Sequence, residues 1–353
     1  SFVLSMQFDK IYFKDIQVKD VVLDGVVINE QSALIEYFEI SDWNEFSFDD
    51  IFVKNFVYKN NINQVSFEDL VIENYYIDTA ATYSLLESNY SQNILGGDYS
   101  QVLNSFKSLD NFQIKNFKSL QKNSKLYSFD SAQLKDLNFD YFGTSTDIKV
   151  PTSLSLEING SDLNAFNFNQ EIGSIPSILG YDSIKFDLGT SWKWNTNNNN
   201  ILVNLDFGLT DAASLKLSTS IADLNTNILT LQGMPLMTYL MTTPKLKDFN
   251  LSLVDNSLKD KLITYGSQMQ NMTTNQFRDF LTQSLNLAST TLGIDQHLAN
   301  EFVVSVINFI NDSKKISISI NPIEPVSVND LIPDIMIQDY SSLFGKLNLK
   351  IAN

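Results

Sequence analysis

The sequence contains no cysteine, and only one histidine, His297, and one arginine, Arg278, among its 353 residues. The absence of cysteine excludes disulfide scaffolds, cysteine zinc sites and thiol nucleophiles. A Ser-His-Asp triad would have to use His297, and no His-Glu-X-X-His pair is present to bind zinc. These absences argue against an enzyme.

Basic residues are also scarce, because 24 Lys and Arg stand against 41 Asp and Glu and give a formal charge of −17. Such a field repels nucleic acid and anionic membrane surfaces, so we predict no nucleic-acid partner. Long apolar runs are missing as well: no stretch of about 18 apolar residues is present to span a bilayer.

Hydrophobic residues, by contrast, make up 43% of the chain, which is enough to bury a substantial core. The N-terminal half repeats a nine-residue pattern: aromatic or Leu, acidic, any, apolar, any, apolar, Lys or Glu, Asp or Asn, apolar. Copies begin at Phe8, Phe48, Phe67, Leu109 and Phe129. The two inner apolar positions fit strand alternation, and we expect the Asp or Asn to end each strand because these residues favour turns. Chance matches in a Phe-rich β protein are the alternative explanation.

The predicted fold class is α+β and β-rich, with an elongated, curved antiparallel sheet built from repeated β units. Residues 1–150 are expected to form a repeat-containing β region with one helical insertion at about 79–107. Residues 151–353 are expected to form β-sheet, including a hairpin of 183–194 with 201–207, and closing C-terminal strands.

A helical insertion at about 256–311 is predicted to pack on this sheet. Thr273 and Gln276 form a capping-box pattern that opens a helix reaching about residue 292, and 296–310 carries one apolar helical face. A short helix at 235–241, a strand at 316–320, a short helix at 329–335 and a strand at 346–351 are also expected.

Motifs that carry chemistry are missing. No glycine-rich phosphate loop or calcium-binding Asp spacing is present. Adjacent acids such as Asp49 and Asp50 point to opposite faces of a strand and do not converge. We therefore predict no catalytic, cofactor-binding or metal-binding residues.

Four segments of the second half resemble uncharacterised alphaproteobacterial cell-envelope proteins with AsmA-like β-rich architecture. They are 191–195 (SWKWN), 249–258 (FNLSLVDNSL), 272–278 (MTTNQFR) and 318–326 (ISINPIEPV), in the same order. The resemblance spans roughly residues 110–335 and transfers no functional residues. It implies an exported, non-catalytic envelope protein, located outside the cytoplasm after removal of a signal upstream of Ser1.

The main functional hypothesis is therefore scaffolding, or handling of lipid or another hydrophobic ligand, by an amphipathic β-sheet, with lipid or other envelope proteins as partners. Candidate apolar-groove residues are Trp192, Trp194, Met237, Tyr239 and Met241, for which core packing is the alternative.

The alternative hypothesis is a self-associating subunit of a surface layer or filament, assembled by strand-edge pairing. The candidate edge residues are Phe2, Leu4 and Met6. A third hypothesis, a carbohydrate-active enzyme with Asp187 or Asp206 as an acid, has no geometric support in the sequence.

Overall fold

The computed structural model divides the chain into two compact units. The first comprises residues 1–167 and 185–192, and the second 168–184 and 193–353. The structure describes residues 7–353 except 24–25, 45–46, 78–105, 123, 142–148, 165–177, 182, 196, 225–227, 229–230, 232 and 292–295. Each unit is described by itself.

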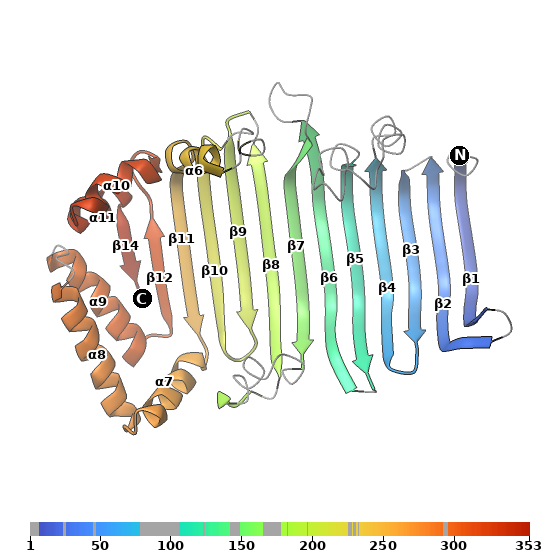
Figure 1. The fold of residues 1–353 in the computed structure, drawn as a ribbon, viewed down its shortest axis with the longest axis horizontal. Coiled ribbons are helices and arrows are strands. Elements are labelled where there is room, and N and C mark those ends of the chain that lie inside the picture. The colour runs from blue at the N-terminus through green and yellow to red at the C-terminus, as the bar shows by residue number, and fades with distance from the viewer. Residues whose placement is uncertain are drawn as a thin grey trace. The chain divides into compact units, whose positions relative to one another are not determined.

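The first unit is an antiparallel sheet whose strands pair in sequence order, as Figure 1 shows for β1 to β7. No helix belongs to this unit within the residues that the structure describes. The strands are β1 (Gln7–Leu23), β2 (Val26–Asn44), β3 (Phe48–Lys59), β4 (Asn63–Ile77), β5 (Phe106–Gln121), β6 (Ser124–Tyr141), β7 (Lys149–Leu163) and most of β8 (Ile184–Asn195).

Each strand from β1 to β7 contains one residue with a positive φ, between 47° and 64°. These residues are Asp15, Asp42, Asn55, Asn74, Asn116, Asp136 and Gly160. Asn, Asp and Gly are the residues that enter this left-handed region at least cost. The pairing register is the same on both sides of Asn55, because Lys54 faces Asp69 and Phe56 faces Phe67. The residue therefore interrupts the ladder without shifting it.

The expectation that the eighth-position Asp or Asn ends a strand is wrong. Asn55, Asn74, Asn116 and Asp136 lie inside β3, β4, β5 and β6, and each strand continues past them. The physical reason is that a single left-handed residue bends a strand locally while its neighbours keep their partners. That these segments arose as repeated units stays a prediction.

The sequence pattern missed one strand of this arrangement. β2 carries the same pattern from Ile35 to Trp43 with two departures, Ile35 at the first position and Ser41 at the seventh. The expected helical insertion at 79–107 falls mainly on residues outside those described, but Phe106 and Lys107 already belong to β5.

The second unit combines antiparallel strands with helices. Its strand order is β9 (Asn200–Leu209), β10 (Ala213–Ala222), β11 (Lys245–Asp255), β12 (Lys315–Ile320) and β14 (Leu349–Ala352), and β13 (Val326–Ser327) pairs with β11. Its described helices are α6 (Gly233–Thr242), α7 (Leu258–Met269), α8 (Thr274–Thr291), α9 (Gln296–Asn311), α10 (Val328–Met336) and α11 (Tyr340–Leu347).

Helix α8 confirms the predicted capping box. The Thr273 backbone N–H donates to Gln276 Oε1 at 2.9 Å, and the Gln276 N–H donates to Thr273 Oγ1 at 3.3 Å. The expected last strand at 346–351 begins too early, because Lys346 and Leu347 close α11 and Asn348 follows in a left-handed conformation. The chain is thus β-rich, with antiparallel sheet in both units.

Candidate functional site

Two rows of apolar side chains cross one face of the first unit from β1 to β7. Residues opposite each other in antiparallel strands share a face, and so do residues two apart in one strand. One row is Ile11, Ile40, Ile51, Ile72, Phe112, Leu134 and Leu156. The other is Phe13, Phe38, Val53, Leu70, Ile114, Ala132 and Ile158. We call these fourteen residues the apolar band.

Burial along the band is uneven. Ile40 and Val53 are buried, at 3% and 9% exposure, whereas Phe13 on β1 is 52% exposed. All described residues of β4 and β5 are at least partly exposed, including Leu70 and Ile114 of the band. The band therefore keeps apolar surface available for a ligand.

The opposite face of the same strands is polar. On this face, the positions between and beside the band residues carry charged side chains on most strands, such as Lys10, Glu39 and Lys115, while Phe52 and Val71 also lie there. Lys10 Nζ lies 2.7 Å from Glu39 Oε1, and Lys115 Nζ lies 3.8 Å from Asp69 Oδ2. The hydrogen bonds from Lys10 and Tyr37 lower the pKa of Glu39, and the bond to Glu39 raises the pKa of Lys10. The sheet is thus amphipathic across β1–β7.

A row of carboxylates and left-handed residues lies on each side of the band, and we call these the border rows. In β1 to β6 an acid stands six residues before the left-handed residue, so that antiparallel pairing places each acid opposite a left-handed neighbour. Asn74 Nδ2 donates to Asp110 Oδ2 at 2.9 Å, and Asn55 and Asn116 donate to Glu36 and Glu68.

On β7 the left-handed position is a glycine. The Gly160 N–H donates to Asp187 Oδ1 at 2.7 Å, and a Cβ at Gly160 would lie 2.2 Å from Asp130 Oδ2. Only a residue without a side chain fits against that carboxylate.

An acidic pocket of about 560 Å³ lies at the β1–β5 ends beside one border row. Its lining residues are Asp9, Asp42, Trp43, Asn44, Ser47, Phe48, Asp49, Tyr76, Ile77 and Lys107. The Tyr76 hydroxyl donates to Asp49 Oδ1 at 3.0 Å. This bond, burial and the charges of Asp49, Asp110 and Asp42 raise the pKa of Tyr76. The field in the pocket favours cationic groups and opposes anions.

Strand β1 is the edge of the first unit's sheet. It pairs with β2, and within the described residues no other strand pairs with it. Tyr12 is 60% exposed and Phe13 52% exposed, and they lie on opposite faces of the strand. An exposed strand edge is a template for a further strand.

The sequence-predicted groove residues occupy two elements. Trp192 and Trp194 lie on β8, where Trp194 Nε1 donates to the Leu224 carbonyl at 3.1 Å. On α6, Tyr239 is buried while Met237 and Met241 are 51% and 40% exposed. A shared groove of these five residues stays a prediction. The candidate edge residues Phe2, Leu4 and Met6 lie outside the described residues.

Both candidate carboxylates of the enzyme hypothesis have structural partners. Asp187 accepts from Gly160, and Asp206 forms an exposed ion pair with Lys216 at 2.7 Å. His297 lies in the first turn of α9. Among the residues that the structure describes, no group of three potential ligands is placed to hold a metal ion.

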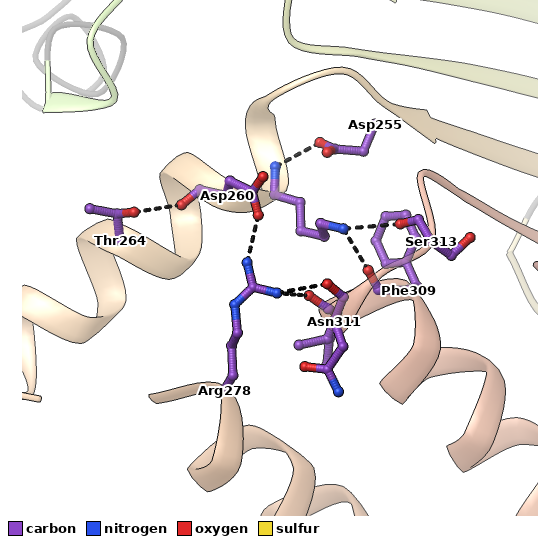
Figure 2. Close-up of polar contacts among 9 residues, drawn as sticks. Asp255, Asp260, Thr264, Arg278, Phe309, Asn311 and Ser313 are labelled. Carbon is purple, nitrogen blue, oxygen red and sulfur yellow. Dashed lines mark hydrogen bonds and ion pairs between the residues drawn. The ribbon is translucent and has the colours of Figure 1, made fainter. Parts of the chain in front are cut away.

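A cationic junction joins α7, α8 and α9 in the second unit (Figure 2). Lys259 Nζ donates to the carbonyls of Phe309 and Ser313 at 2.8 and 3.0 Å. Arg278 donates to the Ile310 and Asn311 carbonyls at 2.5 and 3.1 Å and to Asp260 Oδ1 at 2.7 Å. The last carbonyls of a helix lack internal partners, and cations also stabilise the negative end of the helix dipole. This cluster therefore stabilises the end of α9.

The comparisons with known proteins bear mainly on the second unit. Residues 206–353 match the model of a family described as an uncharacterized protein. A search of curated proteins finds no match to the chain. None of the helices in the described residues is both long enough and apolar enough to cross a membrane.

Sequence reasoning predicted an amphipathic β-sheet but did not identify the residues of the apolar band or of the rows that border it. The signal was present as the constant spacing of six residues between the acid and the Asp or Asn of each copy. When successive strands pair antiparallel, each acid faces the Asp or Asn of its neighbour. The apolar residues that lie between these two positions then face one another across the strands.

Proposed function

We propose that this chain is a non-catalytic scaffold of the bacterial cell envelope, and that its first unit binds the acyl chain of a lipid along the apolar band. The observation that carries this proposal is the continuity of the band: seven strands each contribute two apolar side chains to one face. The proposed envelope location rests on the resemblance of four segments within about residues 110–335 to uncharacterised envelope proteins with AsmA-like β-rich architecture.

The dimensions of the band suit a single acyl chain. Six strand-to-strand steps of about 4.8 Å give a band roughly 29 Å long, and its two rows lie about 7 Å apart. A palmitoyl chain in extended form fits within that length. Burying apolar area contributes about 25 cal/mol per Å² of favourable free energy. An acyl chain that lies along the band is therefore held mainly by the hydrophobic effect.

The test uses a zwitterionic ligand, because a net charge of −17 would repel a fatty acid. Palmitoyl lysophosphatidylcholine, below its critical micelle concentration, is titrated into the protein and binding is followed by native mass spectrometry and calorimetry. Leu70→Gln removes an apolar group from the centre of the band, and we expect at least ten-fold weaker binding.

Val71→Gln is the matched control, because Val71 is the next residue of β4 and points to the polar face. Its affinity should stay within two-fold of the parent chain. Equal losses in both variants, or no binding by the parent, would count against the band as a lipid site. Urea unfolding of each variant separates lost binding from lost folding.

A second function, self-assembly by strand-edge pairing, is favoured by β1, which within the described residues pairs with β2 alone. We propose it beside lipid binding, since a structural scaffold needs contacts between copies. Sedimentation velocity at increasing protein concentration tests it: association is expected, and a monomer at all concentrations would contradict it.

A further inference from the structure

Strand β1 presents to solvent the same pattern by which the inner strands pair. Within β1 to β6, the fourth position of each nine-residue segment faces the sixth of its neighbour. Ile11 thus faces Ile40, and Ile51 faces Ile72. Likewise the first position faces the ninth, as Phe56 faces Phe67. The segment is self-complementary about its fifth position when strands run antiparallel.

We infer that two copies of this chain pair β1 with β1 across a two-fold axis at Tyr12, the fifth position of the segment in β1. This inference rests on the proposed self-assembly and names its partner and register. Tyr12 then faces Tyr12 of the second copy, and Ile11 faces Phe13. A two-fold contact of this kind is self-complementary and closes as a dimer.

Continuity of the apolar band supports a second copy of the chain as the partner of the β1 edge. Ile11 and Phe13 end the two rows at β1, and the inferred register joins each row to the opposite row of the other copy. Phe13 is 52% exposed, whereas Val53, which holds the same position in β3, is buried. Pairing gives Phe13 a neighbour on both sides, as Val53 has.

The features that usually protect a strand edge do not block pairing in this sheet. Lysine and a left-handed residue on an edge strand discourage addition of another strand, and β1 has Lys14 followed by Asp15. Lys54 with Asn55 and Lys115 with Asn116 have the same arrangement, yet β3 and β5 are paired on both sides. The same dipeptide is therefore compatible with a neighbour on β1.

Like charges face each other in this register, because Lys10 lies opposite Lys14 and Asp9 opposite Asp15. The sheet already tolerates such pairs: Asp50 faces Glu73, which together with burial raises the pKa of Asp50. Lys10 is also held by Glu39 of its own chain. Salt screens this repulsion, so the dimer should become tighter as ionic strength rises.

The absence of cysteine allows a direct test of the register. In the Tyr12→Cys variant of the full chain, the two Cα atoms are expected about 4.5–5.5 Å apart, within disulfide range. Lys14 is also exposed and lies on the same face. In Lys14→Cys the two Cα atoms lie four residues out of register, roughly 14 Å apart. Mild oxidation should give at least ten-fold more linked dimer for Tyr12→Cys.

Two results would overturn the inference. Equal linking of both variants means that β1 edges meet without this register, and association without linking at Tyr12 means that another surface joins the copies. In both cases self-assembly itself stands. A monomer by sedimentation in low and high salt, with no linked dimer, removes the register and the self-assembly proposal together.

Discussion

Asparagine at the eighth position of the segment serves both the backbone and the neighbouring strand. Asn55 holds a positive φ of 48° and donates from its side chain to Glu36 of β2. Asp15, Asp42 and Asp136 supply the same backbone conformation elsewhere, with a carboxylate in place of the amide. The residue type therefore follows from two needs that few side chains meet together.

Replacing Asn55 separates these two needs. Asn55→Ala loses the hydrogen bond and strains the backbone, because a left-handed conformation costs an L-residue about 1–2 kcal/mol. Asn55→Gly loses only the bond, since glycine adopts positive φ freely. In urea unfolding we expect Asn55→Ala to be the less stable variant by roughly 1 kcal/mol. Equal stability of the two would show that the backbone conformation contributes nothing.

At the scale of elements, sequence patterns identified the strands and helices of the second unit well. Residues 235–241, 296–310 and 316–320 were expected as helix, helix and strand, and match α6, α9 and β12 within two residues. Apolar periodicity and the Thr273 capping box are local signals, so these elements were readable.

The strands of the first unit were harder to predict, because turn-forming residues lie inside them. A rule that places Asp and Asn at strand ends reads every such residue as a turn. It cannot recognise a left-handed residue inside a strand, where the residues on both sides keep the same pairing register. That distinction depends on the acid of the neighbouring strand, such as Glu36 opposite Asn55, which is distant in sequence. The residues of the apolar band and of the acidic pocket depend on the same cross-strand pairing, so the sequence predicted an amphipathic sheet without identifying these residues.

Arg278 and Lys259 both donate to carbonyls at the end of α9, and Arg278 is the less exposed member of an ion pair with Asp260. Arg278 is 20% exposed and satisfies two carbonyls and Asp260. Arg278→Ala should lower the free energy of unfolding by about 1.5–3 kcal/mol, since hydrogen bonds that involve charged groups contribute in this range. Chemical denaturation followed by circular dichroism measures the loss.

Lys216→Ala provides the comparison. Lys216 and Asp206 are 68% and 54% exposed, and exposed ion pairs contribute about 0–1 kcal/mol. A loss at Lys216 as large as that at Arg278 would contradict the capping role, because both variants remove one positive charge from the second unit.

At the scale of the whole molecule, the proposed lipid site and the inferred dimer contact meet at β1. The inferred contact at β1 extends the apolar band into the second copy, so that an acyl chain has a longer surface in the dimer than in the monomer. Any ligand that binds the dimer more tightly also tightens the dimer, by the same factor for each ligand bound, because binding free energies are coupled reciprocally.

This reciprocity is testable with one pair of variants. Tyr12→Asp places two carboxylates face to face at the two-fold axis, on the face opposite the band. Gln113→Asp adds the same charge at the fifth position of the segment in β5, away from the edge. We expect Tyr12→Asp to weaken the dimer and lower palmitoyl lysophosphatidylcholine affinity several-fold, and Gln113→Asp to change neither more than two-fold. Saturating lipid should in turn lower the dissociation constant of the parent dimer, by the factor that dimerisation adds to lipid affinity for each lipid bound. No change in the dimer constant with lipid, and no change in lipid affinity in Tyr12→Asp, would mean that the band ends at β1 and that the two activities are independent.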